Sequence, residues 1–365
     1  MGGVATYTHA LAEGLRCAGA TVHVVTCWPD PSGTAAPGLA VTRTPAVLNR
    51  KVLKTLPLFV ATVFRYLRSR PRPDWLMLMK CTHEALVGYA LKRLLGARCV
   101  LVVYGGDILE QRRNPIARAV FRSADRILAC STYTKGLFEQ LGTGGARVHV
   151  VHPGIAPSPL LPEDQVRRTR AQHGLEGKLA LLTVSRLVKH KGHDQVLRAL
   201  GMLAARHPNV VYLIVGGGEE RASLERQISA LGLARRVRLL GALPWDEVEG
   251  LYQACDLFVM TSRTEGTDVE GLGMVYLEAS LRGKAIVAGR DGGVPDVVQD
   301  GETGLLVDPT DPAAIARALD RLLSDAGLRR RMGDAGRRRV LEEFSVERSA
   351  ERLRQVLADA DGGNS

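Results

Sequence analysis

Two glutamates, Glu270 and Glu278, are separated by seven residues in a glycine-rich stretch of the chain. The stretch 256–283 opens as a short apolar strand, continues as a polar loop and ends as a helix that a glycine at its end is well placed to terminate. Gly271 and Gly273 precede the helix and let an anion approach its free N–H groups. Two carboxylates beside a positive helix end suit a ligand that combines phosphate with vicinal hydroxyls, such as a nucleotide sugar.

The pattern E-G-L-G-M-V-Y-L-E over 270–278 resembles the paired-glutamate signature of the retaining glycosyltransferases of family four, which have the GT-B fold. The lead-in SRTEGTDVEGLG is especially similar to bacterial α-mannosyltransferases that act on phosphatidylinositol mannosides. The resemblance implies that Glu278 holds the donor's ribose hydroxyls and Glu270 the hydroxyls of the donor sugar. It also assigns Gly271, Leu272 and Gly273 to donor binding. As a lone motif, two glutamates at this spacing also fit a solvated helix face.

A basic turn over 185–192 lies between a predicted strand and a predicted helix. It resembles the family's basic loop, in which an Arg and a Lys five residues apart bind the donor diphosphate, and these correspond to Arg186 and Lys191. Cleavage of a sugar–diphosphate bond leaves a dianionic group, and fixed cations that face it stabilise the developing charge. The alternative is a solvated basic turn.

Two further glycine clusters suit phosphate binding. Gly217 lies in a strand–glycine–helix segment over 215–219, but Arg221 occupies the final position of a G-x-G-x-x-G fingerprint, which argues against a nicotinamide cofactor. The resemblance places this turn near the nucleotide; a purely structural turn fits equally well. Gly2 and Gly3 precede the first predicted helix, where the family's loop faces the donor diphosphate or the acceptor.

One motif departs from the resembled family. The mannosyltransferases carry His-Gly-x-Glu or His-Gly-x-Asp after a strand of the first domain, whereas this chain has Tyr104-Gly-Gly-Asp107. A tyrosine hydroxyl can hydrogen-bond a sugar but cannot carry a positive charge near neutral pH as histidine can. Tyr104 and Asp107 are therefore weak candidates for acceptor or sugar binding, and the donor sugar stays open.

Composition limits the class of protein. The 365 residues fit two domains, and no apolar run approaches the roughly 18–20 residues that cross a bilayer. The N-terminus lacks the features of a signal peptide, so we expect a cytoplasmic protein. The cysteines, whose spacing fits neither zinc nor a disulfide framework, are expected to be buried and reduced; they are Cys17, Cys27, Cys81, Cys99, Cys130 and Cys255.

The elements that must position these residues alternate between strands and helices, which predicts an α/β protein with parallel sheets. In the first half, the pattern predicts strands at 21–27, 75–80, 99–104, 126–130 and 148–151 and helices at 53–69, 84–95, 115–123 and 133–141. In the second half, it predicts strands at 179–184, 210–215, 237–240, 257–261, 285–288 and 304–307. The predicted fold is GT-B: two Rossmann-like, doubly wound domains facing across a cleft.

We expect residues 1–157 to form the acceptor-binding domain and residues 158–345 the nucleotide-sugar-binding domain. Residues 346–365 should form a helix that crosses back to the first domain, followed by a polar tail. In the family a strand precedes the Gly-Gly loop, and here it is absent before Gly2. We therefore expect that the start codon lies further upstream; a fragment is the alternative.

Charge separates the two halves of the chain. Residues 1–157 hold 20 Lys and Arg against 8 Asp and Glu, a net +12, whereas residues 158–365 have a net −1. Within the basic half, the run 49–73 interleaves apolar residues with Arg50, Lys51, Lys54, Arg65, Arg68, Arg70 and Arg72. Such a segment suits the surface of an anionic membrane, at the inner face of the cell membrane. An arginine-rich surface with no membrane role is the alternative.

The predicted function is retaining transfer of a sugar, mannose from GDP-mannose being the first candidate, from a nucleotide-diphosphate donor to a lipid or small-molecule acceptor. The resemblance implies no metal ion and no cofactor, and nucleic acid is not an expected partner. Three alternatives stay open: a UDP-sugar-dependent transferase acting on an aminocyclitol or other natural product, a sugar-nucleotide epimerase of the same fold, and an inactive sugar-nucleotide-binding homologue.

Overall fold

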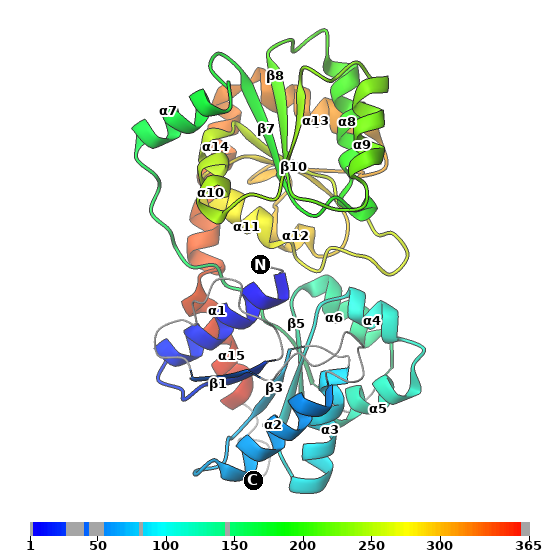
Figure 1. Ribbon diagram of the computed structural model, residues 1–365, viewed down its shortest axis with the longest axis vertical. Helices are drawn as coiled ribbons and strands as arrows, with labels where there is room; N and C mark the ends of the chain where they lie inside the picture. The colour runs from blue at the N-terminus through cyan, green and yellow to red at the C-terminus, as the bar shows by residue number, and fades with distance from the viewer. Residues whose placement is uncertain (1–2, 27–39, 44–54, 80–82, 143–146, 359–365) are drawn as a thin grey trace. The chain divides into compact units, whose positions relative to one another are not determined.

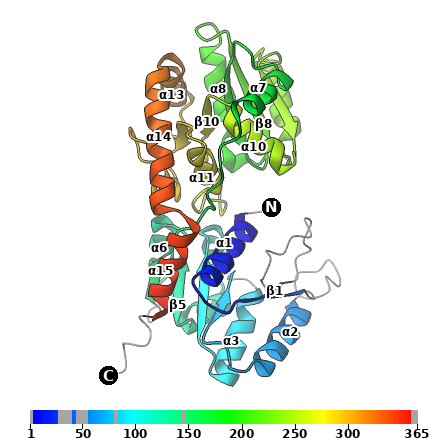
Figure 2. The same cartoon turned by 90° about the vertical axis from the view of Figure 1, so that its left-hand side faces the viewer.

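A computed structural model describes residues 3–26, 40–43, 55–79, 83–142 and 147–358 of the chain (Figures 1 and 2). The chain divides into two compact units. Unit 1 comprises Met1–Ala156 together with Ser345–Ser365, and unit 2 comprises Pro157–Phe344. Each unit has its own parallel sheet and its own core, as the alternating pattern predicts.

Unit 2 is built on a six-stranded sheet in the order β12-β11-β10-β7-β8-β9, in which every pairing is parallel. The strand numbers increase from β7 through β8 to β9 on one side and from β10 through β11 to β12 on the other. The direction of the strand order therefore reverses between the neighbours β7 and β10. The strands are β7 (Leu179–Val184), β8 (Val210–Val215), β9 (Val237–Gly241), β10 (Leu257–Met260), β11 (Ile286–Gly289) and β12 (Gly304–Val307). Strands read as near-continuous apolar runs because helices cover both faces.

Helices cover the two faces of this sheet, and Figure 1 shows α8 and α9 on one side of β7, β8 and β10 and α10 on the other. The α8, α9 and α13 side forms one large core with alternate strand residues such as Leu181, Ile214 and Val259. The helices of unit 2 are α7 (Glu163–Gln172), α8 (His193–Leu203), α9 (Arg221–Ala230), α10 (Trp245–Ala254), α11 (Met274–Leu281), α12 (Val294–Val297), α13 (Pro312–Ser324) and α14 (Ala326–Glu343).

Several predicted bounds in unit 2 are confirmed to the residue, namely those of the strands β7, β8 and β12. Helix α13 begins with two local signals, a capping side chain and a proline. The Asp311 side chain accepts a hydrogen bond from the Ala313 N–H, and Pro312 occupies the first helical position. Gly283, just after α11, has φ +67°, a conformation that glycine adopts without steric cost.

Unit 1 has a four-stranded parallel sheet in the order β3-β4-β5-β6, and β1 pairs separately with β2. Its strands are β1 (His23–Thr26), β2 (Ala40–Arg43), β3 (Leu76–Leu78), β4 (Cys99–Val103), β5 (Arg126–Ala129) and β6 (Arg147–Val150). Its helices are α1 (Gly3–Cys17), α2 (Thr55–Arg68), α3 (His83–Leu95), α4 (Gly106–Gln111), α5 (Pro115–Ser123), α6 (Thr132–Glu139) and α15 (Val346–Ala358).

The C-terminal helix α15 packs within unit 1 against α1. Gly14 makes this approach possible, because a Cβ there would lie 2.8 Å from the Ala350 Cβ. Leu353 joins Tyr7 and Val151 in one buried cluster, and the Tyr7 hydroxyl donates a 2.6 Å hydrogen bond to the Val151 carbonyl. Unit 1 therefore contains residues from both ends of the sequence.

The sequence prediction lacked α7 and three short elements: β2, α4 and the 3-10 turn η1 (Lys189–Lys191). Each of the three short elements has six residues or fewer, too few for a periodic signal. Cys99, Cys130 and Cys255 are buried free thiols as expected, but Cys17 is exposed, so the prediction was wrong there; Cys27 and Cys81 lie outside the described residues. Within the described ranges, no helix is long and apolar enough to cross a membrane.

Candidate active site

The candidate residues of unit 2 gather at the carboxyl edge of its sheet. Lys191 follows β7, Glu270 follows β10, and these two strands are neighbours where the strand order reverses. The loops after β8 and β11 leave the same edge because all the strands are parallel. Open α/β sheets bind ligands at the carboxyl ends of strands at such a reversal point.

Lys191 and Glu270 form an ion pair across this point. The Lys191 Nζ donates to the Glu270 Oε2 at 2.5 Å, and the Ser262 hydroxyl donates to the same oxygen at 3.2 Å. The two charged side chains are only 14% and 12% exposed. The pair is therefore largely withdrawn from water. The lower dielectric constant of the protein interior strengthens the electrostatic interaction between the two charges.

The backbone around the pair is tightly packed. Gly192 has φ +76°, and a Cβ there would lie 2.0 Å from the carbonyl oxygen of Thr261. On the other side of the loop, the Glu270 carbonyl accepts a hydrogen bond from the Gly293 N–H at 2.9 Å. A Cβ on Gly292 would lie 2.4 Å from that same carbonyl oxygen. Glycine is thus required where the loops after β7 and β11 approach the loop after β10.

Helix α11 begins after Gly273, whose φ is +88°, and carries Glu278 inward. The Tyr252 hydroxyl of α10 donates a 2.7 Å hydrogen bond to the Glu278 Oε2. Phe258 of β10 packs between the two helices, stacked on Tyr252 and edge-on to Tyr276. Leu272 is buried, so contact between this residue and a donor would have to involve its backbone.

The two glutamates have opposite pKa shifts. Burial favours the neutral form of Glu270, but the charge and hydrogen bond of Lys191 outweigh burial and lower its pKa. Burial raises the pKa of Glu278, and the Tyr252 hydrogen bond and the Arg282 charge offset only part of this effect. Glu270 is therefore held as a carboxylate, whereas ionisation of Glu278 is opposed by its surroundings.

The other predicted donor contacts occupy the neighbouring loops. Arg186 begins the turn after β7 and its side chain is exposed. Gly217 is exposed, and a Cβ there would meet nothing within 4 Å. The close contacts fall instead on its neighbours: a Cβ on Gly216 would lie 1.9 Å from the Ser185 carbonyl oxygen, and one on Gly218 would lie 2.3 Å from that of Leu187. Packing within the protein thus requires glycine at 216 and 218 but not at 217.

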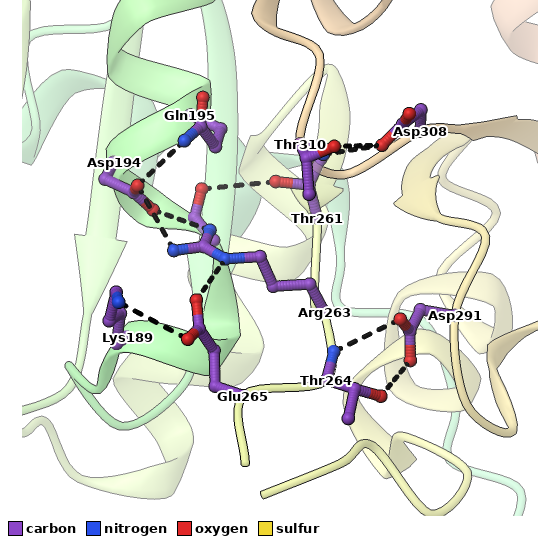
Figure 3. A network of polar contacts seen from close by, with 11 residues as sticks. Lys189, Asp194, Gln195, Thr261, Arg263, Thr264, Glu265, Asp291, Asp308 and Thr310 are labelled. Carbon is purple, nitrogen blue, oxygen red and sulfur yellow. Dashed lines mark hydrogen bonds and ion pairs between the residues drawn. The ribbon is translucent and has the colours of Figure 1, made fainter.

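Sequence reasoning missed three polar residues that support the site: Ser262, Tyr252 and Arg263. Figure 3 shows Arg263 between Asp194 and Glu265, with Lys189 on the far side of Glu265. Ser262 and Arg263 stand in the lead-in that resembles the mannosyltransferases, which was the available signal. Tyr252 had no comparable signal because it lies on a different helix from Glu278.

The predicted binding residues of unit 1 that the structure describes lie at the turn into α4 and at the start of α1. The Asp107 Oδ1 accepts hydrogen bonds from the Tyr104 and Ile108 N–H groups, so this carboxylate closes the turn that enters α4. The Tyr104 ring packs edge-on against Tyr7. Gly3 begins α1, and Gly2 lies outside the described residues. In the portion of the chain that the structure describes, no cluster of three or more His, Cys, Asp or Glu could hold a metal ion.

Solved structures with the same architecture define the class. Sucrose-phosphate synthase from Thermosynechococcus elongatus matches with a TM-score of 0.82 and 23% identity, over 100% of this chain and 94% of that one. HepE from Anabaena, crystallised in complex with UDP, matches with a TM-score of 0.80 and 22% identity, over 98% and 96%. The predicted fold is confirmed: the protein has the fold of the GT-B glycosyltransferases.

Sequence relatives give the family. Models described as Glycosyltransferase Family 4 and Glycosyl transferases group 1 match residues 1–158 and 165–339. GDP-mannose-dependent alpha-(1-6)-phosphatidylinositol monomannoside mannosyltransferase from Mycolicibacterium smegmatis is 37% identical over 281 residues, which are 75% of this chain and 73% of the relative. The protein of the same name from Mycobacterium tuberculosis strain H37Rv is 33% identical over 74% and 72%. The chain therefore belongs to the family-four glycosyltransferases, which transfer a sugar from a nucleotide donor.

The opposite pKa shifts predict different pH dependences of stability for two amide substitutions. A raised pKa in the folded state means that Glu278 contributes stability below its unfolded pKa of about 4.3, and that this contribution is lost as the pH rises through the folded pKa. We therefore expect the melting temperature of Glu278→Gln to increase relative to that of the wild type as the pH rises above about 4.3. Thermal unfolding at a series of pH values measures this difference.

Glu270→Gln is the matched comparison. The lowered pKa of Glu270 in the wild type means that this carboxylate contributes stability above its unfolded pKa of about 4.3. This contribution is lost only as the pH falls through the pKa of the folded state. This variant should melt below the wild type by a constant margin from pH 5 to 8. If the two variants showed the same pH dependence, the assigned environments of the two carboxylates would be wrong.

Proposed function

We propose that the protein is a retaining, metal-independent glycosyltransferase that moves mannose from GDP-mannose to a hydroxyl of a lipid or small-molecule acceptor. The observation that carries the proposal is the Lys191–Glu270 pair at the point where the strand order reverses. The names of the two mycobacterial relatives support the donor and the class of acceptor. Unit 1 would bind the acceptor, and unit 2 would bind the donor.

Each site residue has a distinct proposed role. One N–H group of the Lys191 ammonium bonds Glu270, and its other N–H groups would bind the diphosphate of the sugar donor. Arg186 supplies a second, exposed cation. Glu270, kept ionised, would accept hydrogen bonds from the sugar hydroxyls. Glu278 would accept hydrogen bonds from the ribose, and the backbone of Gly271, Leu272 and Gly273 at the start of α11 would approach the phosphates.

In the proposed reaction, the acceptor oxygen attacks the anomeric carbon on the face from which the diphosphate leaves. The bond from this carbon to the diphosphate oxygen breaks, the bond to the acceptor oxygen forms, and the acceptor proton passes to the departing phosphate oxygen. Arg186 and Lys191 would stabilise the charge that accumulates on the diphosphate, which is the role a metal ion plays in other glycosyltransferase folds.

A second candidate is a UDP-sugar-dependent transferase that acts on a soluble cyclitol or another natural product. Two observations favour it. A D-inositol 3-phosphate glycosyltransferase from Salinispora tropica is 34% identical over 70% of this chain and 55% of its own length. In addition, Tyr104 replaces the histidine that the sequence motif of the mannosyltransferases leads one to expect.

Donor choice separates the two candidates. Isothermal titration with GDP and with UDP should give at least tenfold tighter binding of GDP, a difference of about 1.4 kcal/mol. Transfer from GDP-mannose should then give an α-linked product by NMR, at a rate that EDTA does not change. Tighter binding of UDP would favour the second candidate, and an inverted product would contradict retention. Binding of neither nucleotide would remove the proposed function.

Substitution of the two cations tests the chemistry. Their interaction with the diphosphate should strengthen as the glycosidic bond breaks, so Arg186→Ala and Lys191→Ala should each lower kcat by about a hundredfold or more. Arg186→Lys should recover only part of this loss, because a point charge does not reproduce a two-pronged contact. Glu278→Gln is the control and should raise the donor KM with little change in kcat. Near-normal kcat in both alanine variants would remove the basic turn from the active site.

We also propose that α2 of unit 1 contacts an anionic membrane surface. Val60, Phe64 and Leu67 are 57%, 60% and 45% exposed, although the other side of the helix packs into the core through Tyr66. The exposed Arg65 and Arg68 flank them, and Arg68 lies over the Phe64 ring. An exposed apolar row bordered by arginines suits the boundary between lipid headgroups and acyl chains. Arg50, Lys51 and Lys54 of the same basic run lie outside the described residues.

Vesicle binding tests the contact of α2 with lipid. The wild type should bind vesicles that contain phosphatidylglycerol, and binding should weaken with salt and with Arg65→Glu/Arg68→Glu. Phe64→Ser should weaken binding without changing its salt dependence. The control is Arg330→Glu/Arg331→Glu, which changes the same net charge at exposed positions on α14 of unit 2. Absent binding, or an equal loss in the control, would reject the α2 surface.

A further inference from the structure

Arg263 is a buried cation that the proposed mechanism does not use. Its side chain is 7% exposed, and its guanidinium contacts two carboxylates. Nη1 and Nη2 donate to the two oxygens of Asp194 at 2.8 and 3.2 Å, and Nε donates to Glu265 at 2.7 Å. Lys189 pairs with the second oxygen of Glu265 at 3.3 Å. Two cations and two anions thus form a neutral group, which Figure 3 shows.

These contacts join two loops that are distant in the sequence. Asp194 lies at the start of α8 and Lys189 in the turn η1, whereas Arg263 and Glu265 lie in the loop after β10. The backbone reinforces the junction, because the Arg263 N–H donates to the His190 carbonyl at 2.8 Å. The Thr261 hydroxyl donates to the Gly192 carbonyl at 3.1 Å. The segment 189–194 is therefore attached to the segment 261–265 at several points.

The two joined segments lead to the ion pair of the site. Lys191 stands between Lys189 and Gly192 on one segment, and Ser262, which contacts Glu270, directly precedes Arg263 on the other. Beyond Arg263, the Thr264 N–H and hydroxyl both donate to Asp291, at 3.1 and 2.6 Å. The loop that ends in Glu270 is thus fastened to the turn after β7 on one side and to the turn after β11 on the other (Figure 3).

We propose that Arg263 is a positioning residue for sugar transfer: its guanidinium, clamped between Asp194 and Glu265, fixes the loops that carry Lys191 and Glu270. The proposal rests on the proposed function. Because its side chain is almost fully buried, Arg263 does not touch the donor and acts through the residues it holds. A displacement of about 1 Å of a group that stabilises the transition state lowers the rate by up to about a hundredfold.

Geometry, rather than charge, is the proposed basis of this role. A planar guanidinium reaches Asp194 with two N–H groups and Glu265 with a third at the same time, and a lysine ammonium cannot reproduce this fork. Arg263→Lys keeps the neutral charge of the group and removes the fork. It therefore separates positioning from a simple electrostatic contribution to donor binding.

The experiment compares Arg263→Lys with Arg170→Lys in the full chain. Arg170 donates to the carbonyls of Ala254, Leu175 and Lys178 at the amino ends of the strands, the edge opposite the site. Both variants lose several arginine hydrogen bonds and should melt below the wild type. Only Arg263→Lys should lower kcat, by about 10- to 100-fold, while the donor KM changes less than about threefold. In the Lys191→Ala background, Arg263→Lys should cause a loss of kcat about tenfold smaller than in the wild type, because the ammonium group that Arg263 positions is gone.

Hydrogen exchange gives a readout that does not depend on turnover. Amides in 189–193 and 262–270 should exchange faster in Arg263→Lys than in Arg170→Lys, which should instead loosen 175–180 and 254–256. Wild-type kcat and wild-type protection in Arg263→Lys would overturn the clamp and leave the proposed function standing. A wild-type protein that transfers no sugar from GDP or UDP donors would overturn the proposed function, and the exchange data would still decide whether Arg263 fixes these loops.

Discussion

The ion pair between Lys191 and Glu270 joins the loops that follow two neighbouring strands, and the surrounding backbone is shaped by it. Both side chains are largely withdrawn from water, and loss of one partner of such a pair costs about 3–5 kcal/mol because the other charge is left uncompensated. The loops must therefore approach closely enough for contact. Gly192 and Gly292 meet this requirement, since a side chain at either position would collide with the loop after β10.

The two glutamates of the motif have the same chemistry but different surroundings. Glu270 lies outside the helix against a cation, whereas Glu278 lies inside α11 against a tyrosine hydroxyl and an aromatic layer. The lowered pKa of Glu270 favours its ionised form, whereas the raised pKa of Glu278 favours its neutral form. A ligand with hydroxyls near both residues would find one acceptor of fixed charge and one whose charge depends on what binds beside it. This difference supports separate roles for the donor sugar and the ribose.

Side chains join the loops of this site to one another, in addition to the sheet below. Arg263, Asp194 and Glu265 connect the loops after β7 and β10, and Asp291 extends the connection to β11. In unit 1 a carboxylate serves a similar local purpose, since Asp107 closes the turn into α4. The hydrogen bonds that close this turn come from backbone N–H groups, and the side chain of Tyr104 stands where the resembled family has histidine. The backbone structure of this turn and the chemistry of the half-buried Tyr104 side chain are therefore separable here.

Much of the fold could be predicted from the sequence, because a buried parallel strand is a short apolar run between turn residues, as β7, β8 and β12 are. The residues with the chemistry of a nucleotide-sugar site could also be named, since Glu270, Glu278 and Lys191 stand in local motifs. Short elements such as β2 and α4 lack a periodic signal. Contacts across the sheet were decided only by tertiary structure: Lys191 meets Glu270 across 79 positions, and Arg263 meets Asp194 across 69. Alternating strands and helices are compatible with many strand orders, and only the order that places β10 beside β7 brings these charges together.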